Sequence, residues 1–204
     1  MQNSARTTDY FSRRDTRVAD LAAFLADTLA GKPPLTLEIG CGHGHYLTAY
    51  ATAHPEKFCV GIDLLNDRIE RAGRKRHRAR VENLIFLQAE AREFLGALPA
   101  SASLADIFVL FPDPWPKRRH HKNRIIQPEF LSALAAKARH GARLYFRTDY
   151  APYHADAQAT VEAHAEWQVE AAGRFPFELE TVFQSRAASY QSIVATRVRQ
   201  PPTI

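Results

Sequence analysis

The chain has 204 residues, of which 46% are hydrophobic and 24% are charged. This composition is that of an ordinary globular protein, so general disorder is excluded, and the length is enough for one domain with a full core. Lys and Arg number 27 against 22 Asp and Glu, which gives a net charge of +5. The two cysteines, Cys41 and Cys59, form no Cys-x-x-Cys pair. This excludes a disulfide framework and favours a reducing, cytoplasmic setting.

The N-terminal residues 1–32 predict a helical segment, and residues 33–204 predict the core of a single domain. Apolar residues recur at helical spacing before Gly31 and Pro33-Pro34, which end the helix: Val18, Leu21, Phe24, Leu25, Thr28 and Leu29. The pair Arg13-Arg14 stands before a moderately apolar stretch, as in a twin-arginine leader. Four charged residues interrupt that stretch: Asp15, Arg17, Asp20 and Asp27. We therefore expect an amphipathic helix here and no leader.

After this segment, short apolar runs alternate with helical patterns. The runs predict strands at residues 35–39, 58–62, 84–87, 106–111, 143–148, 167–170 and 191–198, with helices at 45–54, 66–80, 91–98, 128–140 and 152–164. The longest apolar run, residues 107–112, is too short to span a membrane. Such alternation predicts an α/β fold, in which a mostly parallel sheet has helices on both faces. Ligands bind such sheets at the carboxyl ends of the strands, so the loops after residues 39, 62, 87, 111 and 148 carry the candidate site.

The first of these loops, residues 38–45, places glycines at alternate positions: Gly40, Gly42 and Gly44. Glycines permit a sharp turn and a close approach of the backbone to a ligand. Glu38 just before them would repel a pyrophosphate and suits a cationic amine, and Asp63 ends the next strand, where an acidic residue commonly meets ribose hydroxyls. Together these residues favour S-adenosylmethionine as the cofactor, although a turn used only for helix–strand packing is an alternative.

The loop after the fourth strand contains three prolines at alternate positions around Asp113 and Trp115. Prolines fix φ and remove backbone donors, so this loop is stiff and holds the Asp113 carboxylate firmly. Trp115 is either a hydrophobic plug or a platform on which a base stacks.

Basic residues are concentrated in two segments, with seven in residues 68–80 and five in residues 117–124. Concentrated positive charge attracts polyanions, so the two segments together favour nucleic acid over a merely solvated helix face. We expect seven side chains to contact RNA: Arg71, Lys75, Arg78, Arg118, Arg119, Lys122 and Arg124.

The chain resembles the bacterial tRNA (guanine-N7)-methyltransferases from about residue 35 to residue 153. Four segments carry the resemblance: residues 40–44, residues 61–63, residues 111–117 with His120 and Lys122, and residues 127–130. It implies a Rossmann-like class I methyltransferase with a seven-stranded sheet and S-adenosylmethionine as cofactor. It also implies methyl transfer to N7 of a guanosine in tRNA, the variable-loop guanosine at tRNA position 46.

The resemblance also implies roles for individual residues. Four acidic residues match the cofactor-side positions of the family: Glu38, Asp63, Glu90 and Asp113. Asp113 is also the implied catalytic residue, and Lys117, Asp149 and Thr181 match substrate-binding positions. The chain departs from the family at Asp63, where Glu is usual, and at residues 181–184, which read Thr-Val-Phe-Gln where the family has Thr-Lys-Phe-Glu.

Three functional classes stay open. The first is guanine N7 methylation of tRNA, and the second is methylation of another RNA site or of an exocyclic amine. The third is a non-catalytic RNA-binding protein, which the intact acidic and glycine positions disfavour. The nine histidines include His43, His45, His120 and His121, but none has a ligand set at zinc spacing, so we expect no metal. The sequence does not distinguish a monomer from a homodimer.

Overall fold

The computed structural model describes residues 2–179 and 189–198, with side chains from residue 15 onward. The helices are α1 (Gln2–Thr28), α2 (His45–Ala53), α3 (Asn66–Ala79), α4 (Ala91–Ala97), α5 (Pro128–Lys137) and α6 (Ala151–Glu162), with a 3-10 helix η1 (Arg118–Asn123). The strands are β1 (Leu35–Ile39), β2 (Cys59–Asp63), β3 (Leu84–Gln88), β4 (Leu104–Leu110), β5 (Ala138–Thr148), β6 (Trp167–Val169) and β7 (Gln191–Arg197).

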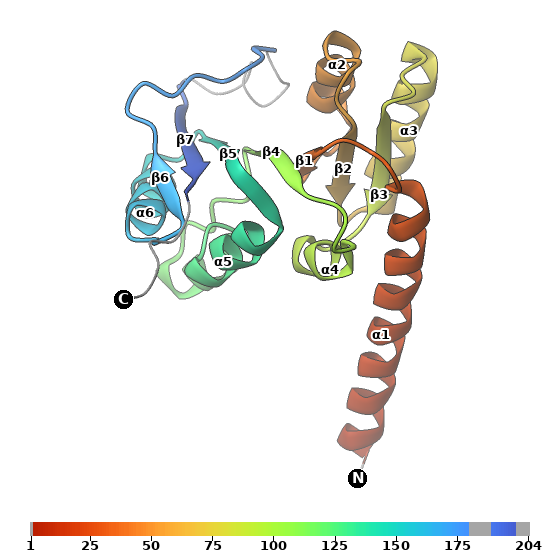
Figure 1. The fold of residues 1–204 in the computed structure, drawn as a ribbon. Helices are drawn as coiled ribbons and strands as arrows, with labels where there is room; N and C mark the ends of the chain where they lie inside the picture. The colour runs from red at the N-terminus through yellow and green to blue at the C-terminus, as the bar shows by residue number, and fades with distance from the viewer. Residues whose placement is uncertain (1, 180–188, 199–204) are drawn as a thin grey trace, which may run out of the picture.

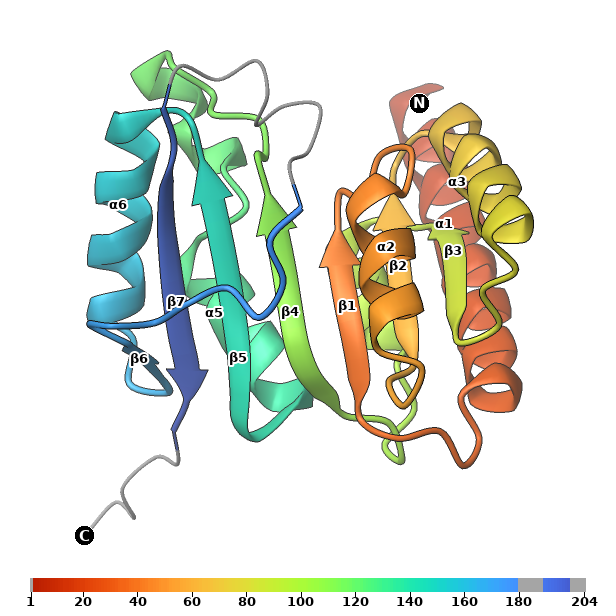
Figure 2. The same ribbon diagram turned by 90° about the horizontal axis from the view of Figure 1, so that it is seen from above.

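The seven strands form one sheet in the order β3-β2-β1-β4-β5-β7-β6 (Figure 2). Strands β1 to β5 pair in parallel, and β7 runs antiparallel to both β5 and β6. The predicted seven-stranded, mostly parallel sheet is therefore confirmed. The strand order reverses between β1 and β4, which is the place where an open α/β sheet receives its ligand.

The two faces of the sheet are covered differently. Helices α1, α4, α5 and α6 bury their apolar residues on one face, where Leu25, Phe94, Leu131 and Tyr153 join the larger core cluster. Helices α2 and α3 cover β1 to β3 on the other face (Figure 1). Over β4, β5 and β7 that face is covered by the extended residues 171–179, which cross the strands in Figure 2. Helices thus lie on both faces, as predicted, but an extended segment completes the second one.

Helix α1 packs on the core through its C-terminal half. Leu25 and Leu29 are buried, and Arg17 forms an ion pair of 2.7 Å with Glu93 of α4. Phe24, which shares the helical spacing of the apolar residues, is 47% exposed, because its neighbour Leu25 already faces the core. Figure 1 shows the N-terminal half extending away from the sheet. No helix in the described part of the chain is long and apolar enough to cross a membrane.

The boundary between α5 and β5 differs from the prediction. We expect a helix to residue 140 and a strand from residue 143, but α5 ends at Lys137 and β5 begins at Ala138. Leu104 of β4 pairs with Ala138, whereas Asp106 pairs with Arg143, so the extra residues bulge out of the ladder. Gly141 within this bulge has a φ of 76°, which glycine adopts without steric cost.

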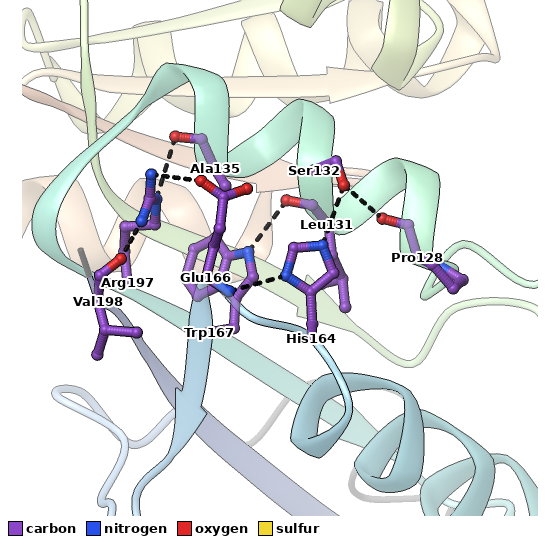
Figure 3. Close-up of polar contacts among 9 residues, drawn as sticks. All are labelled: Pro128, Leu131, Ser132, Ala135, His164, Glu166, Trp167, Arg197 and Val198. Atoms are coloured by element: carbon purple, nitrogen blue, oxygen red, sulfur yellow. Dashed lines mark hydrogen bonds and ion pairs between the residues drawn. The ribbon is translucent and has the colours of Figure 1, made fainter. Parts of the chain in front are cut away.

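Polar contacts fix the β6–β7 pair on α5 (Figure 3). The Trp167 indole N–H donates to the carbonyl of Leu131 at 3.0 Å, and Arg197 Nε donates to the carbonyl of Ala135 at 3.2 Å. Arg197 also pairs with Glu166 at 2.7 Å. The Ala135 carbonyl is one of the last four of α5, which have no partner within the helix, and together these bonds hold the antiparallel edge of the sheet in place.

Replacement of Gly61 tests the packing under the first loop. A Cβ at Gly61 would lie 2.5 Å from the Phe86 ring and 3.1 Å from the Cys41 Cβ. Because a packed core resists added volume, Gly61→Ala should lower the free energy of unfolding by about 1–3 kcal/mol, measured by urea denaturation. Gly96→Ala is the matched control, since nothing lies within 4 Å of its Cβ position in α4. It should raise stability by about 0.5–1 kcal/mol through helix propensity. Equal effects of the two changes would contradict this packing.

Candidate functional site

The loops after β1 and β4 leave the sheet side by side at the point where strand order reverses. Glu38 of β1 pairs with Gly61 of β2 on one side and with Phe108 of β4 on the other. The residues that follow these positions therefore converge at one edge of the sheet. This edge brings together the loops that begin after Ile39, Asp63 and Leu110.

The loop after β1 turns through three glycines with positive φ: 73° at Gly40, 52° at Gly42 and 66° at Gly44. The sharp glycine turn predicted from the sequence is confirmed. The Phe86 ring of β3 supports the loop from below, because a Cβ on Gly44 would lie 2.5 Å from it. Apart from the adjoining residues of the loop, no atom of the described residues lies within 4 Å of the Cβ positions of Gly40 and Gly42. This side of the loop is open for the backbone to approach a ligand.

Asp63 ties the loops after β1 and β2 together. Its Oδ2 accepts a hydrogen bond from the Gly42 N–H at 3.0 Å, and its Oδ1 accepts one from the Leu65 N–H at 3.0 Å. The Arg68 guanidinium lies 3.5 Å from Oδ2. The carboxylate is buried, with 4% of its side chain exposed. Asp63 therefore fixes the loop geometry, in addition to the ribose contact that we expect of it.

Glu38 is a buried carboxyl group at the centre of the site. Burial raises the pKa of Glu38 to about 8, against a hydrogen bond from the Leu47 backbone N–H that lowers it, while the charge of Asp63 raises it further. Oε2 of Glu38 is buried and has no hydrogen-bond partner in the described part of the chain. A buried acceptor without a donor is costly, so this atom is available to a ligand that brings an N–H.

Cys41 lies in the same loop but is not a nucleophile. Burial raises the pKa of the Cys41 thiol, and the negative charges of Glu38 and Asp63 raise it further. A thiol that keeps its proton is inert. Cys41 therefore serves packing beside Gly61.

Glu90 caps helix α4 at the same edge. Its Oε2 accepts hydrogen bonds from the N–H groups of Arg92 at 2.9 Å and Glu93 at 3.0 Å. This is the usual arrangement of an N-cap carboxylate. The expected role of Glu90 toward the cofactor stays a prediction.

The loop after β4 holds two bulky residues in the left-handed region. Phe111 has a φ of 50° and Trp115 a φ of 44°. Such conformations are strained outside glycine and persist only where the surroundings enforce them. Asp113 lies between them and is exposed, and the Trp115 ring packs edge-on against His120 at 5.7 Å. The stiff loop predicted from the prolines is thus also a strained one.

Arg147 supports the start of this loop from β5. Its carbonyl accepts a hydrogen bond from the Phe111 N–H at 2.8 Å. The guanidinium carbon lies 3.9 Å from the centre of the Phe175 ring and 4.6 Å from that of Tyr190. Nη2 of the same group forms an ion pair with Glu178 at 3.1 Å. The residues 171–179 are thereby fastened over the end of β5. Sequence reasoning missed Arg147, although an arginine at the carboxyl end of an apolar run, directly after Leu144-Tyr145-Phe146, is a usable signal.

Of the expected RNA-contacting side chains, one is not on the surface and a second is partly buried. Arg124 is 3% exposed and contacts Pro114, Tyr153 and Asp156. The ammonium nitrogen of Lys75 is buried without a hydrogen-bond partner among the described residues, and this burial, with the charge of Arg78, lowers the pKa of Lys75 to about 8. The prediction that Arg124 belongs to an exposed positive surface is wrong, because its side chain folds back against α6 and the loop after β4. For Lys75 the RNA contact stays a prediction.

The remaining expected residues lie near the carboxyl ends of the strands or on α3. The exposed basic ones are Arg71, Arg78, Lys117, Arg118, Arg119 and Lys122. Asp149 is exposed directly after β5, and Thr181 lies outside the described residues. The sequence reading also missed Arg68, which faces Asp63, and the exposed Leu64 and Leu65 beside it.

No group of three or more histidine, cysteine, aspartate or glutamate side chains in the described part of the chain is placed to hold a metal. A Ser132–His164 pair at 3.0 Å joins α5 to the loop between α6 and β6 (Figure 3). Because His164 Nδ1 accepts the Glu166 N–H at 3.2 Å, a neutral ring carries its proton on Nε2 and donates it to Ser132. The histidine cannot then remove the serine proton, so this pair is structural.

Comparison with known proteins places the chain in a family. Residues 32–178 match the family model Methyltransf_4, described as "Putative methyltransferase". The chain belongs to this methyltransferase family. A tRNA (guanine-N(7)-)-methyltransferase of Syntrophotalea carbinolica is 37% identical over 144 residues, 71% of this chain and 61% of that protein. One of Magnetococcus marinus is 36% identical over 178 residues, 83% of this chain and 70% of that protein. This member of the family thus spans less than two thirds of the first relative.

Solved structures confirm the fold of this family member. A mutant of the 16S rRNA (adenine(1408)-N(1))-methyltransferase of Catenulisporales acidiphilia, solved with cosubstrate SAM, superposes with a TM-score of 0.63 at 21% identity, over 90% of this chain and 94% of that one. The 16S rRNA methyltransferase KamB superposes with a TM-score of 0.64 at 20% identity, over 83% and 90%. The Rossmann-like class I methyltransferase fold is therefore confirmed.

The residues present fit S-adenosylmethionine. The unpartnered Oε2 of Glu38 is an acceptor for an ammonium group, and the open side of Gly40 and Gly42 leaves room for a ligand against the backbone. Two buried carboxyl groups, Glu38 and Asp63, suit a ligand that is cationic and has no phosphate.

Glu38→Gln tests the buried carboxyl group in the free protein. The folded chain keeps the Glu38 proton up to a pH of about 8, whereas the ordinary pKa is 4.5. The wild-type free energy of unfolding should therefore fall as pH rises between these values, and Gln, which cannot ionise, removes this loss. In urea denaturation, the free energy of unfolding of the variant minus that of the wild type should increase from pH 5 to pH 8. The exposed Glu82→Gln is the control, and a pH-independent difference for Glu38→Gln would contradict the assignment.

Proposed function

We propose that the chain transfers a methyl group from S-adenosylmethionine to N7 of a guanosine in tRNA, the variable-loop guanosine at tRNA position 46. The observation that carries the proposal is the meeting of two loops at the β1/β4 reversal point. One supplies a buried carboxyl group and an open glycine turn, and the other supplies the exposed Asp113 in a strained loop followed by basic residues. The names of the relatives support the same reaction. We place the protein in the cytoplasm, which its free cysteines support.

When bound, S-adenosylmethionine supplies a methyl group activated by its sulfonium. Glu38 Oε2 accepts a hydrogen bond from the ammonium end of the cofactor. The Asp63 oxygens each accept one backbone N–H, from Gly42 and Leu65, and their remaining lone pairs accept hydrogen bonds from the ribose hydroxyls. The positive φ of the glycine turn lets the backbone lie against the ligand. These residues orient the cofactor and exclude water from its charged end.

The guanine N7 atom has a lone pair and no proton, so it needs no general base. The chain instead aligns N7 with the methyl group and stabilises the positive charge that the purine gains as the bond forms. The Asp113 carboxylate, at the end of β4, is the group that we assign to this charge. Lys117 lies on the same loop and Asp149 on the loop after β5, and both hold the nucleotide.

Asp113→Asn tests the catalytic assignment. The change keeps the size of the side chain and removes its charge, so methyl transfer to tRNA should fall by about 100-fold or more, while cofactor affinity changes little. The measurement is mass spectrometry of tRNA nucleosides after single-turnover reactions, with calorimetry for the cofactor. Asp27→Asn on the exposed part of α1 is the control. A variant that forms N7-methylguanosine at the wild-type rate would reject Asp113, and methylation of another nucleoside would reject the proposed substrate.

We also propose that the exposed arginines of α3 and the basic residues of η1 contact tRNA phosphates. Arg71 and Arg78 lie two turns apart on one face of α3, and Arg118, Arg119 and Lys122 are exposed on η1. Phosphate contacts position the RNA without reading its sequence, and each contributes about one unit to the salt dependence of binding.

The double variant Arg71→Glu with Arg78→Glu tests this surface. It should weaken tRNA binding and lower the slope of log affinity against log salt by about two units, with cofactor binding intact. The control is Lys32→Glu with Arg139→Glu, which changes the net charge equally at exposed residues outside α3 and η1. Equal slopes for the two double variants would show that α3 presents only a solvated face.

A further inference from the structure

Arg124 is the buried arginine that joins the loop after β4 to helix α6. Its Nε donates to the carbonyl of Pro114 at 2.8 Å, and its Nη1 donates to the carboxylate of Asp156. The guanidinium carbon lies 4.8 Å from the centre of the Tyr153 ring, and 2% of the side chain is exposed. A buried cation with this set of partners is held in one position.

The Pro114 carbonyl, which accepts the hydrogen bond from Arg124, lies in the strained part of the loop. Pro114 precedes Trp115, whose φ is 44°, and it follows Asp113 directly. A hydrogen bond to the Pro114 carbonyl fixes the plane of the peptide bond between residues 114 and 115. This plane sets the direction in which the chain leaves Asp113 and enters Trp115. The strain therefore has an identifiable restraint, and Arg124 provides it.

The residues of α6 that hold the Arg124 guanidinium, Tyr153 and Asp156, are themselves fixed by further contacts. Tyr153 is fully buried in α6, and its hydroxyl accepts the Ile126 N–H at 3.2 Å. Asp156 is one turn further along α6, and His121 of η1 also lies 3.6 Å from its carboxylate. Helix α6 begins two residues after Asp149. The loops after β4 and β5, which carry the expected catalytic and substrate residues, are thus braced against each other.

We propose that Arg124, held by Asp156 and Tyr153, is a positioning residue that keeps the Asp113–Trp115 turn in its strained, reactive conformation. It acts through the Pro114 carbonyl and does not touch RNA. The proposal rests on the proposed function for its catalytic consequence, but its structural consequence stands on its own. Removal of the contact lets the turn relax and displaces the Asp113 carboxylate.

Arg124→Lys tests the proposal, because lysine keeps the charge but lacks the Nε donor and the planar group that stacks on Tyr153. In single-turnover reactions at saturating tRNA and cofactor, methyl transfer should slow by about 100-fold, as expected for a small misplacement of a reacting group. The tRNA affinity, its salt slope and the cofactor affinity should stay at wild-type values. Arg139→Lys, an exposed arginine at the start of β5, is the matched control.

Tryptophan quenching gives a readout that does not depend on activity. Of the two tryptophans, Trp167 is 3% exposed and Trp115 is partly exposed, so iodide quenching reports mainly on Trp115. Arg124→Lys should increase the quenching constant, and Asp156→Asn should do so to a smaller extent, because the amide oxygen still accepts from Arg124. Asp156→Asn alters an exposed side chain, so it keeps the test valid should the arginine variant fold poorly.

The outcomes separate the two proposals. A wild-type protein that methylates no tRNA would reject the proposed function, while the quenching change would still support the positioning role. Wild-type quenching and rate in both variants would overturn the positioning role. A normal rate at saturation with weaker tRNA binding would show that Arg124 is a phosphate contact, which also overturns the positioning role.

Discussion

The geometry of the site depends on the two hydrogen bonds that the buried Asp63 carboxylate accepts. Its two oxygens accept N–H groups from the loops after β1 and β2, so one side chain sets the geometry of both. The same negative charge adds to the burial that raises the pKa of Glu38 on the neighbouring strand. Two acids at the ends of paired strands are unfavourable in the free protein. Such an arrangement is maintained where a cationic ligand relieves it, which links the stability of the loop to ligand binding.

Across the reversal point, the loop after β4 stores strain of a different kind. Two non-glycine residues with positive φ, Phe111 and Trp115, flank the exposed Asp113. The loop is restrained at its start by the carbonyl of Arg147 and at Pro114 by the guanidinium of Arg124. Both arginines are buried and stacked on aromatic rings. One side of the site is therefore shaped by glycines, and the other is held in place by buried cations.

Much of this could be predicted from the sequence. Strand and helix positions follow from the alternation of apolar runs and helical patterns, and the glycine turn follows from its residue spacing. The errors have a common cause. Arg124 belongs to a basic, surface-like segment, and only its contacts show that the side chain folds inward; the burial of the Lys75 ammonium nitrogen is likewise not visible in the sequence. The bulge in β5 arises from its pairing with β4, which local sequence does not encode.

The sequence by itself determined the order of the elements, the sheet edge at which the loops meet, and the acidic and glycine residues placed there, because these depend on local periodicity and on the rules of parallel sheets. Only the tertiary structure decided which polar groups are buried and what they contact. The unpartnered oxygen of Glu38, the bridging role of Asp63 and the inward turn of Arg124 are results of packing between segments far apart in the chain. Burial and partners set the chemistry of a side chain, and neither is a property of the residue alone.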